Sequence, residues 1–258
     1  MKCIVVMPTY NERPNIEAIV PAVLANGPDW RVLIVDDGSP DGTGEAADAL
    51  AARDPRVNVL HRAGKLGLGT AYRDGLSRAL ALGCDYACTM DSDFSHDPKA
   101  LPKLRELAET AGAAHGSRYI PGGAVIGWSF IRKVNSACAN FLTRLFLGVK
   151  LRDCTSGFRC YRGDVLEKLQ PATLTAKGYA VLEELLLRCR ILGVAPAEHP
   201  IIFPERKAGR SKINIGESFN ALRMLIKLRL RGWQPQPAPP AGKPAAPATR
   251  GSGAGKAP

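Results

Sequence analysis

Two hydrophobic patterns alternate along the first 117 residues of this chain. Short continuous apolar runs, typical of strands buried on both faces, are separated by segments whose apolar positions recur every three or four residues, as in amphipathic helices. The predominantly apolar runs are residues 3–7, 31–35, 57–60, 86–90 and 113–117, and residues 4–6 and 32–35 are apolar throughout. The helical segments are residues 15–25, 42–52, 69–82 and 98–111. This alternation predicts an α/β fold in which helices flank a mostly parallel sheet.

The pattern changes after residue 118, where the chain becomes basic, helical and mixed. A last amphipathic segment predicts a helix over residues 216–231. Residues 234–258 are rich in Pro, Ala and Gly and lack apolar periodicity, which predicts a disordered tail. We therefore expect one domain over residues 1–233, followed by the tail.

The formal net charge of +11 is distributed unevenly. Residues 110–152 contain no acidic residue, and residues 206–231 contain only Glu217. Such asymmetry favours a partner that carries phosphate: nucleic acid, anionic lipid or a phosphorylated substrate. Few aromatic residues accompany the basic ones, and no RRM, KH or zinc-finger pattern appears, so we expect no nucleic-acid partner.

Several expectations concern the cellular compartment. The seven cysteines form no CxxC pair and have no nearby His cluster, which favours reduced thiols packed in the core over a zinc site. No stretch approaches the roughly 18 apolar residues of a membrane-spanning helix. The first residues show no cleavage site of an export signal. Together these features predict a cytoplasmic protein.

Two acidic clusters follow predicted strands. Asp36 and Asp37 come after the second apolar run, and Asp91 and Asp93 come after the fourth. The carboxyl ends of parallel strands meet at the edge where open α/β sheets bind ligands. Two acids separated by one residue suit a divalent metal that holds a diphosphate. Alternatively, Asp91 and Asp93 cap the helix that follows.

A glycine-rich segment, residues 64–69, loosely resembles a dinucleotide-binding loop. It follows the third predicted strand instead of the first, and the spacing of a G-x-G-x-x-G motif is not met. We interpret these glycines as a tight turn into the next helix.

Six motifs carry a resemblance to a known family. Residues 6–12 (VMPTYNE), 35–43 (VDDGSPDGT) and 90–98 (MDSDFSHDP) resemble family 2 glycosyltransferases of the GT-A fold. Residues 116–119 (GSRY), 153–159 (DCTSGFR) and 203–212 (FPERKAGRSK) resemble the polyprenol (dolichol) phosphate mannose synthase branch. The resemblance covers residues 1 to about 231. It implies transfer of mannose from GDP-mannose to a polyprenyl phosphate, with inversion and a divalent metal, Mg²⁺ or Mn²⁺.

The resemblance also implies a division of the chain. Residues 1–117 form a nucleotide-sugar half and residues 118–233 an acceptor and membrane-facing half. The implied donor-binding residues are Pro8, Tyr10, Glu12, Val35, Asp37, Asp91, Ser92, Asp93, Arg206 and Lys212. The implied metal ligands are Asp91, Asp93 and Ser95, although Ser95 stands where some relatives carry Gln. Arg118 and Arg132 correspond to acceptor-phosphate arginines, and together with Asp93 they are the expected catalytic residues.

The chemistry of these side chains agrees with those roles. Tyr10 can stack on a base, and Glu12 and Asp37 can accept hydrogen bonds from a nucleoside. Arginine suits phosphate recognition. A phosphate monoester, with a second pKa of about 6, is already ionised at neutral pH and needs no protein base. We therefore predict in-line displacement at the sugar C1, with Arg206 and Lys212 stabilising the departing GDP.

Several alternatives remain open at this stage. The enzyme could be a polyprenyl-phosphate glucosyltransferase or another family 2 transferase that uses a UDP-sugar. A different class is a non-catalytic basic protein that binds nucleotides or nucleic acid. Asp153, Glu183 and Glu184 could shape the site, or they could cap helices and form surface ion pairs.

Two segments, residues 126–149 and 219–233, mix large apolar residues with basic ones. This composition is typical of a helix lying in a membrane interface, and core packing is the alternative. A polyprenyl acceptor lies in a bilayer, so we expect peripheral attachment to the cytoplasmic face of a membrane. A separate membrane anchor protein is a further expected partner.

Overall fold

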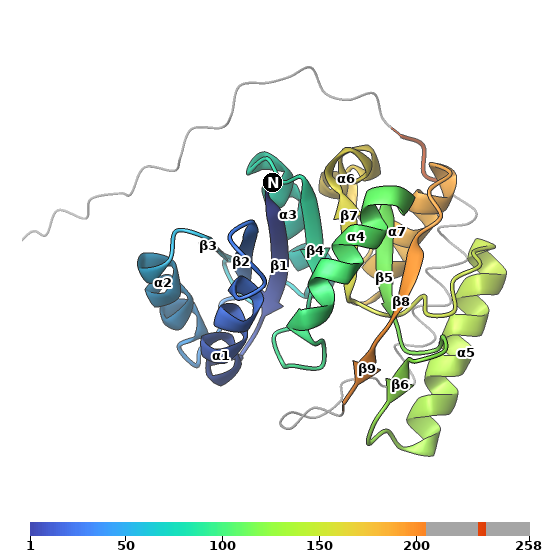
Figure 1. The fold of residues 1–258 in the computed structure, drawn as a ribbon, viewed down its shortest axis with the longest axis horizontal. Helices are drawn as coiled ribbons and strands as arrows, with labels where there is room; N and C mark the ends of the chain where they lie inside the picture. Colours follow the sequence, from blue (N-terminus) through green and yellow to red (C-terminus); the bar gives the residue numbers. More distant parts are fainter. Residues whose placement is uncertain (205–231, 236–258) are drawn as a thin grey trace, which may run out of the picture.

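The computed structural model describes residues 1–204 and 232–235 (Figure 1). Arg206, Lys212 and the helix predicted over residues 216–231 lie outside the described residues. So do most of the second membrane-interface segment and nearly all of the predicted tail.

A central sheet organises the described part of the chain. Its strands are β1 (Cys3–Thr9), β2 (Trp30–Asp36), β3 (Val57–His61), β4 (Tyr86–Thr89), β5 (Ala113–Ser117), β7 (Arg159–Arg162) and β8 (Ala197–Pro200). They lie in the order β3-β2-β1-β4-β7-β5-β8, and β7 alone runs antiparallel to its neighbours within this sheet. A small parallel pair, β6 (Ala124–Val125) and β9 (Ile202–Phe203), extends beyond it. The predicted mostly parallel sheet is confirmed.

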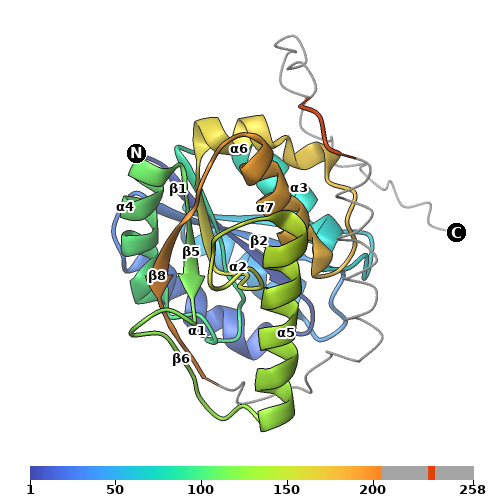
Figure 2. The same cartoon turned by 90° about the vertical axis from the view of Figure 1, so that its right-hand side faces the viewer.

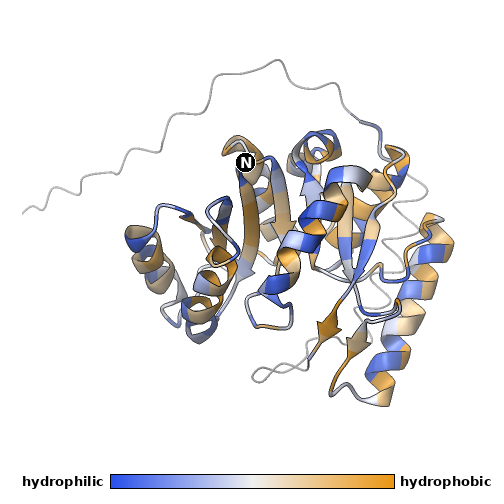
Figure 3. Ribbon diagram, in the orientation of Figure 1, coloured by the Kyte–Doolittle hydropathy of each residue, from blue (hydrophilic) through white to orange (hydrophobic). Residues whose placement is uncertain are grey.

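Helices cover both faces of the sheet, which accounts for the continuous apolar runs of its strands. One face packs against α1 (Arg13–Leu24), α2 (Thr43–Arg53) and α4 (Leu101–Ala111), the last entered through the short 3₁₀ helix η1 (Pro98–Ala100). The other face packs against α3 (Leu68–Ala81), α6 (Gly163–Leu169) and α7 (Ala180–Ile191), with the 3₁₀ helix η2 (Pro171–Thr173) after α6. Figure 3 shows the apolar residues of the strands between these layers. The described residues thus form an apolar core on each side of the sheet, and a third, smaller apolar cluster joins Leu147 of α5 to Leu186 and Leu187 of α7.

The strand directions bring several loops to one edge of the sheet. β1, β2, β4 and β5 end there, because β1 pairs parallel with β2 and β4, and β7 runs antiparallel to both β4 and β5. β7 begins at the same edge for that reason. The segments that follow β1, β2, β4 and β5, and the segment that precedes β7, therefore lie close together. Five of the motif segments in the sequence meet at this edge.

Helix α5 (Phe130–Leu147) lies at one end of the molecule, beyond β5 and β8 (Figures 1 and 2). Only three of its residues are buried: Asn140, Thr143 and Leu147. Figure 3 shows apolar and polar residues mixed along its length. Within the described ranges, no helix has the length and apolar content needed to cross a bilayer.

All seven cysteines are free thiols. Six of them are buried, which confirms the predicted core packing for those six. Cys138 differs, because it is exposed on α5.

Candidate active site

The loop after β1 and the loop after β2 are bonded to each other at the sheet edge. Pro8 and Val35 are partners in the β1–β2 register. The Asp37 amide donates to the Thr9 carbonyl at 3.0 Å, and the Glu12 amide donates to the Thr43 hydroxyl at 3.0 Å. The predicted nucleoside-binding residues of the two motifs thus occupy one continuous surface.

Asp37 is buried and already engaged. Its carboxylate forms an ion pair with Arg62 and accepts a hydrogen bond from the Gly67 amide at 2.8 Å. Arg62 also forms an ion pair with Asp74 at 3.3 Å. Since a carboxylate can accept about four hydrogen bonds, Asp37 retains capacity for a nucleoside. The ion pair with Arg62 fixes the orientation of the Asp37 carboxylate.

The glycine-rich segment 64–69 lies against the predicted nucleoside residues. Besides the Gly67 contact with Asp37, the Lys65 ammonium lies 4.0 Å from the centre of the Tyr10 ring. Gly38, with φ of +67°, approaches the segment so closely that a Cβ there would lie 2.8 Å from the Gly64 Cα. The sequence pattern predicted only a turn here, and the contacts with Asp37 and Tyr10 are visible only in the structure. The proximity arises because β3 lies beside β2 in the sheet.

The loop after β4 holds Asp91, Ser92 and Asp93. The Asp93 Oδ1 accepts hydrogen bonds from the Ser95 amide at 3.0 Å and the Ser95 hydroxyl at 2.5 Å. Phe94, between them, has φ of +59°, a left-handed conformation that is unusual for a bulky residue. This tight turn fixes the Asp93 carboxylate. Ser95, a predicted metal ligand, is only 1% exposed and contacts Asp93 itself.

The oxygen atoms of this loop fit a divalent cation that is shared with a diphosphate. Carboxylates are the ligands that Mg²⁺ prefers, and Mg²⁺ usually binds one or two of them together with substrate phosphates. In residues 1–204 and 232–235, no group of three or more His, Cys, Asp and Glu side chains gathers as a metal site. Asp91 and Asp93 therefore suit a cation that a diphosphate helps to hold.

His96 connects this loop to two other segments. Its Nδ1 accepts the Asp91 amide hydrogen at 3.1 Å, which makes Nε2 the protonated nitrogen of a neutral ring. The ring stacks on Phe158 with centroids 4.8 Å apart and meets the edge of Phe203 at 5.5 Å. His96 thus holds the Asp91 backbone in place, a contact that no motif in the sequence indicated.

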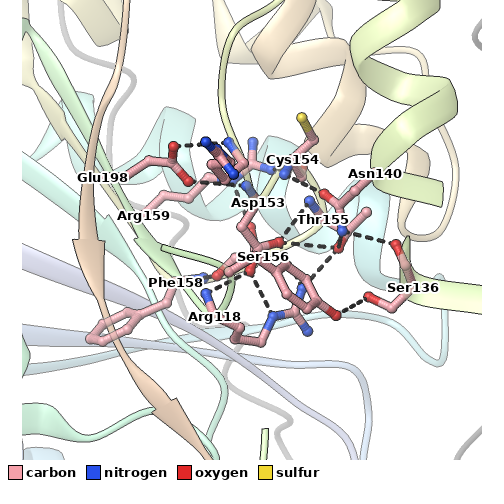
Figure 4. A network of polar contacts seen from close by, with 12 residues as sticks. Arg118, Ser136, Asn140, Asp153, Cys154, Thr155, Ser156, Phe158, Arg159 and Glu198 are labelled. Atoms are coloured by element: carbon pink, nitrogen blue, oxygen red, sulfur yellow. Dashed lines mark hydrogen bonds and ion pairs between the residues drawn. The ribbon is translucent and has the colours of Figure 1, made fainter. Parts of the chain in front are cut away.

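Arg118 follows β5 and forms a buried bidentate ion pair with Asp153 (Figure 4). The Nε to Oδ2 distance is 2.7 Å and the Nη2 to Oδ1 distance is 2.8 Å. The Arg118 Nη2 also donates to the Thr155 hydroxyl at 2.8 Å. Burial by itself raises the pKa of Asp153, but the hydrogen bonds and charge of Arg118 outweigh it and hold that pKa below its ordinary value. Both groups are therefore charged at neutral pH.

Arg132, on α5, meets Arg118 at a shared aromatic ring. The Arg132 guanidinium carbon lies 3.9 Å from the Trp128 ring centre, and that of Arg118 lies 5.3 Å from it. Trp128 in turn meets the edge of Phe203 at 5.6 Å. The two arginines predicted from distant motifs are thus brought together at Trp128, a residue that the sequence analysis placed only in a membrane-interface segment.

Gly157 joins the acidic loop to the segment that holds Asp153. Its carbonyl accepts a hydrogen bond of 2.6 Å from Thr89, at the end of β4. A Cβ at Gly157 would lie 4.0 Å from the Asp91 Oδ1 and 3.3 Å from the Tyr72 hydroxyl. The acidic loop therefore lies beside the segment that holds Asp153, the partner of Arg118.

Of the three acids whose role the sequence left open, none lies on the surface. Asp153 binds Arg118, as described above. Glu184 binds the buried Arg188 guanidinium at 2.6 Å and accepts hydrogen bonds from the Thr175 and Ala176 amides. The third acid, Glu183, is also buried. The alternative of exposed surface pairing is wrong for all three.

Glu183 predicts a pH dependence of stability. Burial raises its pKa from an ordinary value of 4.5 to about 7, against the opposing charge of the nearby Arg159. The folded state then keeps a proton that the unfolded state releases, so the free energy of unfolding falls as pH rises from about 4.5 to about 7 and levels off above that. Glu183→Gln should remove this part of the profile, about 3 kcal/mol. Urea unfolding of both proteins from pH 4.5 to 8 measures it, and parallel profiles would contradict it.

A model of glycosyl transferase family 2 matches residues 4–170. The chain is 42% identical over 233 residues to polyprenol monophosphomannose synthase of Mycolicibacterium smegmatis, covering 90% of this chain and 88% of that protein. It is 41% identical to undecaprenyl-phosphate mannosyltransferase of Micrococcus luteus, covering 84% of this chain and 89% of that protein. These relatives confirm the resemblance that the motifs predicted.

Comparison with solved structures agrees with the sequence relatives. A crystal structure of glucosyl-3-phosphoglycerate synthase from Mycobacterium tuberculosis, in complex with Mn²⁺, UDP and glucosyl-3-phosphoglycerate, superposes with a TM-score of 0.63 at 23% identity. The alignment covers 89% of this chain and 79% of that one. The predicted GT-A fold is confirmed. The chain is a glycosyltransferase and belongs to glycosyl transferase family 2.

Proposed function

We propose that this enzyme transfers mannose from GDP-mannose to a polyprenyl phosphate, with inversion at the anomeric carbon. The observation that carries the proposal is the convergence of two acids and two arginines at one sheet edge. Asp91 and Asp93 suit a cation shared with a donor diphosphate, and Arg118 and Arg132 meet at Trp128. The names of the two relatives, a polyprenol monophosphomannose synthase and an undecaprenyl-phosphate mannosyltransferase, support the acceptor class and the sugar.

The donor residues of the proposal are those of the first half of the chain. Tyr10, Glu12 and Asp37, with backbone groups of Val35 and Ser92, would surround the nucleoside. Asp91 and Asp93 would hold Mg²⁺ or Mn²⁺, which neutralises charge on the departing diphosphate when bound. Asp93 is well suited to this role because Ser95 fixes its carboxylate.

The acceptor phosphate must approach a second phosphate-bearing molecule, and the basic half of the site offsets their repulsion. The charge of Arg118 is largely balanced by Asp153, and its Nε and Nη2 are occupied. Its Nη1 receives no hydrogen-bond acceptor from the described residues, so this nitrogen can donate to a phosphate. Arg132 adds the second positive charge. Arg118 thus supplies a fixed donor, and Arg132 lies beside it at Trp128.

The chemistry of the step follows from the ionisation of the acceptor. An acceptor phosphate oxygen attacks the sugar C1, the bond from C1 to the diphosphate oxygen breaks, and GDP leaves. No proton has to be removed from the nucleophile, since a phosphate monoester is largely dianionic above pH of about 6. Inversion follows from a single in-line displacement. The proposed basic pair Arg206 and Lys212, which lies outside the described residues, would stabilise the departing GDP.

The donor is the least constrained part of the proposal, because a UDP-sugar would use the same cation and arginines. An experiment decides between them: the protein is incubated with polyprenyl phosphate, Mg²⁺ or Mn²⁺ and either GDP-mannose or UDP-glucose. We expect glycolipid from GDP-mannose, with the anomeric carbon inverted when the product is examined by NMR. If glycolipid forms with UDP-glucose and not with GDP-mannose, the donor is a UDP-sugar. Retention of configuration at the anomeric carbon would contradict the mechanism.

We also place the enzyme on the cytoplasmic face of a membrane, through α5. The whole length of α5 and the residues before it expose a row of large apolar side chains, among them Ile126, Phe130, Ile131, Val134, Phe141 and Leu145. Arg132, Lys133 and Arg144 lie on the same helix. The core-packing alternative fails for these side chains, because they are exposed. Exposed apolar residues beside basic ones are typical of a helix that binds an anionic lipid surface. A membrane anchor protein stays a prediction.

This placement predicts that the apolar row binds vesicles. The double substitution Phe141→Glu with Leu145→Glu should lower binding to vesicles containing phosphatidylglycerol at least tenfold, since buried charge opposes insertion. Leu66→Glu is the matched control, because Leu66 is 58% exposed against 57% for Phe141 and 61% for Leu145, and it lies far along the chain from α5. Flotation at low and high salt measures binding. Equal binding of the double variant and the wild type would contradict the placement.

A further inference from the structure

Helix α5 is buried only in its C-terminal half. Its buried residues, Asn140, Thr143 and Leu147, lie on one face, three and four residues apart. Residues 130–139 contain no buried side chain, and Arg132 lies in this part of the helix. Arg132 itself contacts Trp128, and Asn140 is the nearest buried residue of α5 that can hold this part of the helix in place.

Asn140 bonds α5 to the segment that begins at Asp153 (Figure 4). The Asn140 Oδ1 accepts the Cys154 amide hydrogen at 2.6 Å. The Asn140 Nδ2 donates to the Ser136 carbonyl at 2.9 Å and to the Thr155 hydroxyl at 3.3 Å. One amide side chain thus satisfies a buried backbone N–H and contacts two further groups.

The Thr155 hydroxyl connects Asn140 to the arginine pair. It accepts a hydrogen bond from Arg118 Nη2 at 2.8 Å as well as the one from Asn140. A second link lies one helical turn earlier, where the Tyr119 hydroxyl donates to the Ser136 hydroxyl at 2.7 Å. Arg118 and α5 are therefore joined through two short polar connections. The Thr155 hydroxyl oxygen thus connects Asn140 with Arg118.

The hydrogen bonds made at position 140 require an amide side chain. Aspartate would keep the acceptor for Cys154 but would place a second carboxylate beside Asp153, in a buried environment where like charges repel. Leucine fills a similar volume but leaves the Cys154 amide without an acceptor. Only the amide offers the acceptor and the donors that this junction uses.

We propose that Asn140 is a positioning residue that fixes α5, and with it Arg132, against the Arg118–Asp153 pair. The consequence for catalysis rests on the proposed function: the two arginines act on one acceptor phosphate only when α5 is held at this junction. Asn140 does not touch the reacting atoms. Its loss should impair use of the acceptor and leave use of the donor intact, because the acidic loop and the nucleoside residues lie on other segments.

Two measurements on Asn140→Leu test this inference. The first is hydrogen exchange of the full chain without substrates, in which residues 130–139 should exchange at least fivefold faster than in the wild type. The second is steady-state kinetics, in which the KM for polyprenyl phosphate should rise at least tenfold while the KM for GDP-mannose changes less than twofold. Thr143→Val is the matched control. Thr143 is buried on the same helix face, and the described residues give it no hydrogen bond to segment 153–155.

A second pair of variants keeps the test decisive if Asn140→Leu fails to fold. Thr155→Val removes the shared hydroxyl and should reproduce both effects, and Thr155→Ser should restore wild-type behaviour. Unchanged exchange of residues 130–139 in both Asn140→Leu and Thr155→Val would overturn the inference, as would equal rises in both KM values. If the wild-type protein forms no glycolipid, the proposed function fails, and the exchange experiment still decides whether Asn140 holds α5.

Discussion

Replacing Asp93 by Asn is expected to reduce glycosyl transfer by about a thousandfold, because a carboxylate that helps to hold the catalytic cation contributes several kcal/mol to charge stabilisation in the transition state. Asparagine has nearly the same shape as aspartate. It can still accept the hydrogen bonds that Ser95 donates, so the loop should keep its conformation. The measurements are kcat with saturating substrates and Mn²⁺ affinity by calorimetry, and both should fall together.

Ser95→Ala is the matched control for this substitution. It removes the 2.5 Å hydrogen bond to Asp93 Oδ1 but keeps the charge, so the loss should be about tenfold, the effect of one hydrogen bond to a charged group. A larger loss in Ser95→Ala than in Asp93→Asn would instead favour Ser95 as a ligand. Activity of Asp93→Asn within tenfold of the wild type would contradict the assigned role of Asp93.

The second large effect is expected on stability, at the Arg118–Asp153 pair. Asp153→Ala should lower the free energy of unfolding by about 3–5 kcal/mol, because it leaves the buried Arg118 guanidinium without its partner. It also removes the acceptor for the Arg118 amide, at 2.9 Å. Chemical denaturation at pH 7 gives this quantity directly, from the midpoint and slope of the transition.

An exposed pair of the same chemistry serves as the control. Arg162 and Asp164 are bonded at 2.6 Å, but their side chains are 36% and 50% exposed. Asp164→Ala should therefore cost about 0–1 kcal/mol. The double variant Arg118→Met with Asp153→Leu should be more stable than Asp153→Ala, since it removes the unpaired charge. If Asp153→Ala and Asp164→Ala lower the free energy of unfolding by the same amount, the Arg118–Asp153 pair does not behave as a buried ion pair.

The N-terminal part of the fold could be predicted because its strands are buried on both faces. Runs such as residues 3–7 and 32–35 have no polar interruption, and β1 and β2 extend over Cys3–Thr9 and Trp30–Asp36. Their flanking helices carry clear apolar stripes. Local pattern and final environment coincide there, so the sequence alone identifies the elements.

Later strands carry no such pattern. β7 reads Arg-Cys-Tyr-Arg, yet its Arg159 side chain is fully buried and donates to the Ser156, Leu182 and Cys154 carbonyls. β8 contains Glu198, whose carboxylate accepts the Arg152 and Asp153 amides. Charged residues in a strand suggest exposure, and only the tertiary structure shows the backbone groups that satisfy them. Neither strand was predicted for that reason.

In the candidate site, too, the sequence predicts some features and only the structure shows the others. Motifs identified Arg118 and Arg132 separately, and the structure shows that they meet at Trp128. The partners that hold the site together came from the structure alone: Asp153 as the ion-pair partner of Arg118, and Asn140 at the base of α5. Such contacts join residues from different loops, so no spacing in the sequence reveals them.

The membrane segment illustrates a pattern that was visible but ambiguous. Residues 126–149 contain enough apolar side chains for either a core helix or an interfacial one. The structure buries Trp128 and Leu147 and exposes Phe130 and Phe141. Core packing thus holds for the buried side chains, and membrane contact stays a prediction for the exposed ones. The amino-acid composition of the segment could not distinguish the side chains that are buried from those that are exposed.

The most direct test of the proposed function is transfer of radioactivity from GDP-[¹⁴C]mannose into the organic phase in the presence of polyprenyl phosphate and Mg²⁺. We predict a mannolipid whose formation requires the phosphate of the acceptor, stops when EDTA is added and is lost in Asp93→Asn. A polyprenyl alcohol should not replace the phosphate. Absence of labelled lipid with GDP-mannose, or equal labelling of the alcohol, would contradict the proposal.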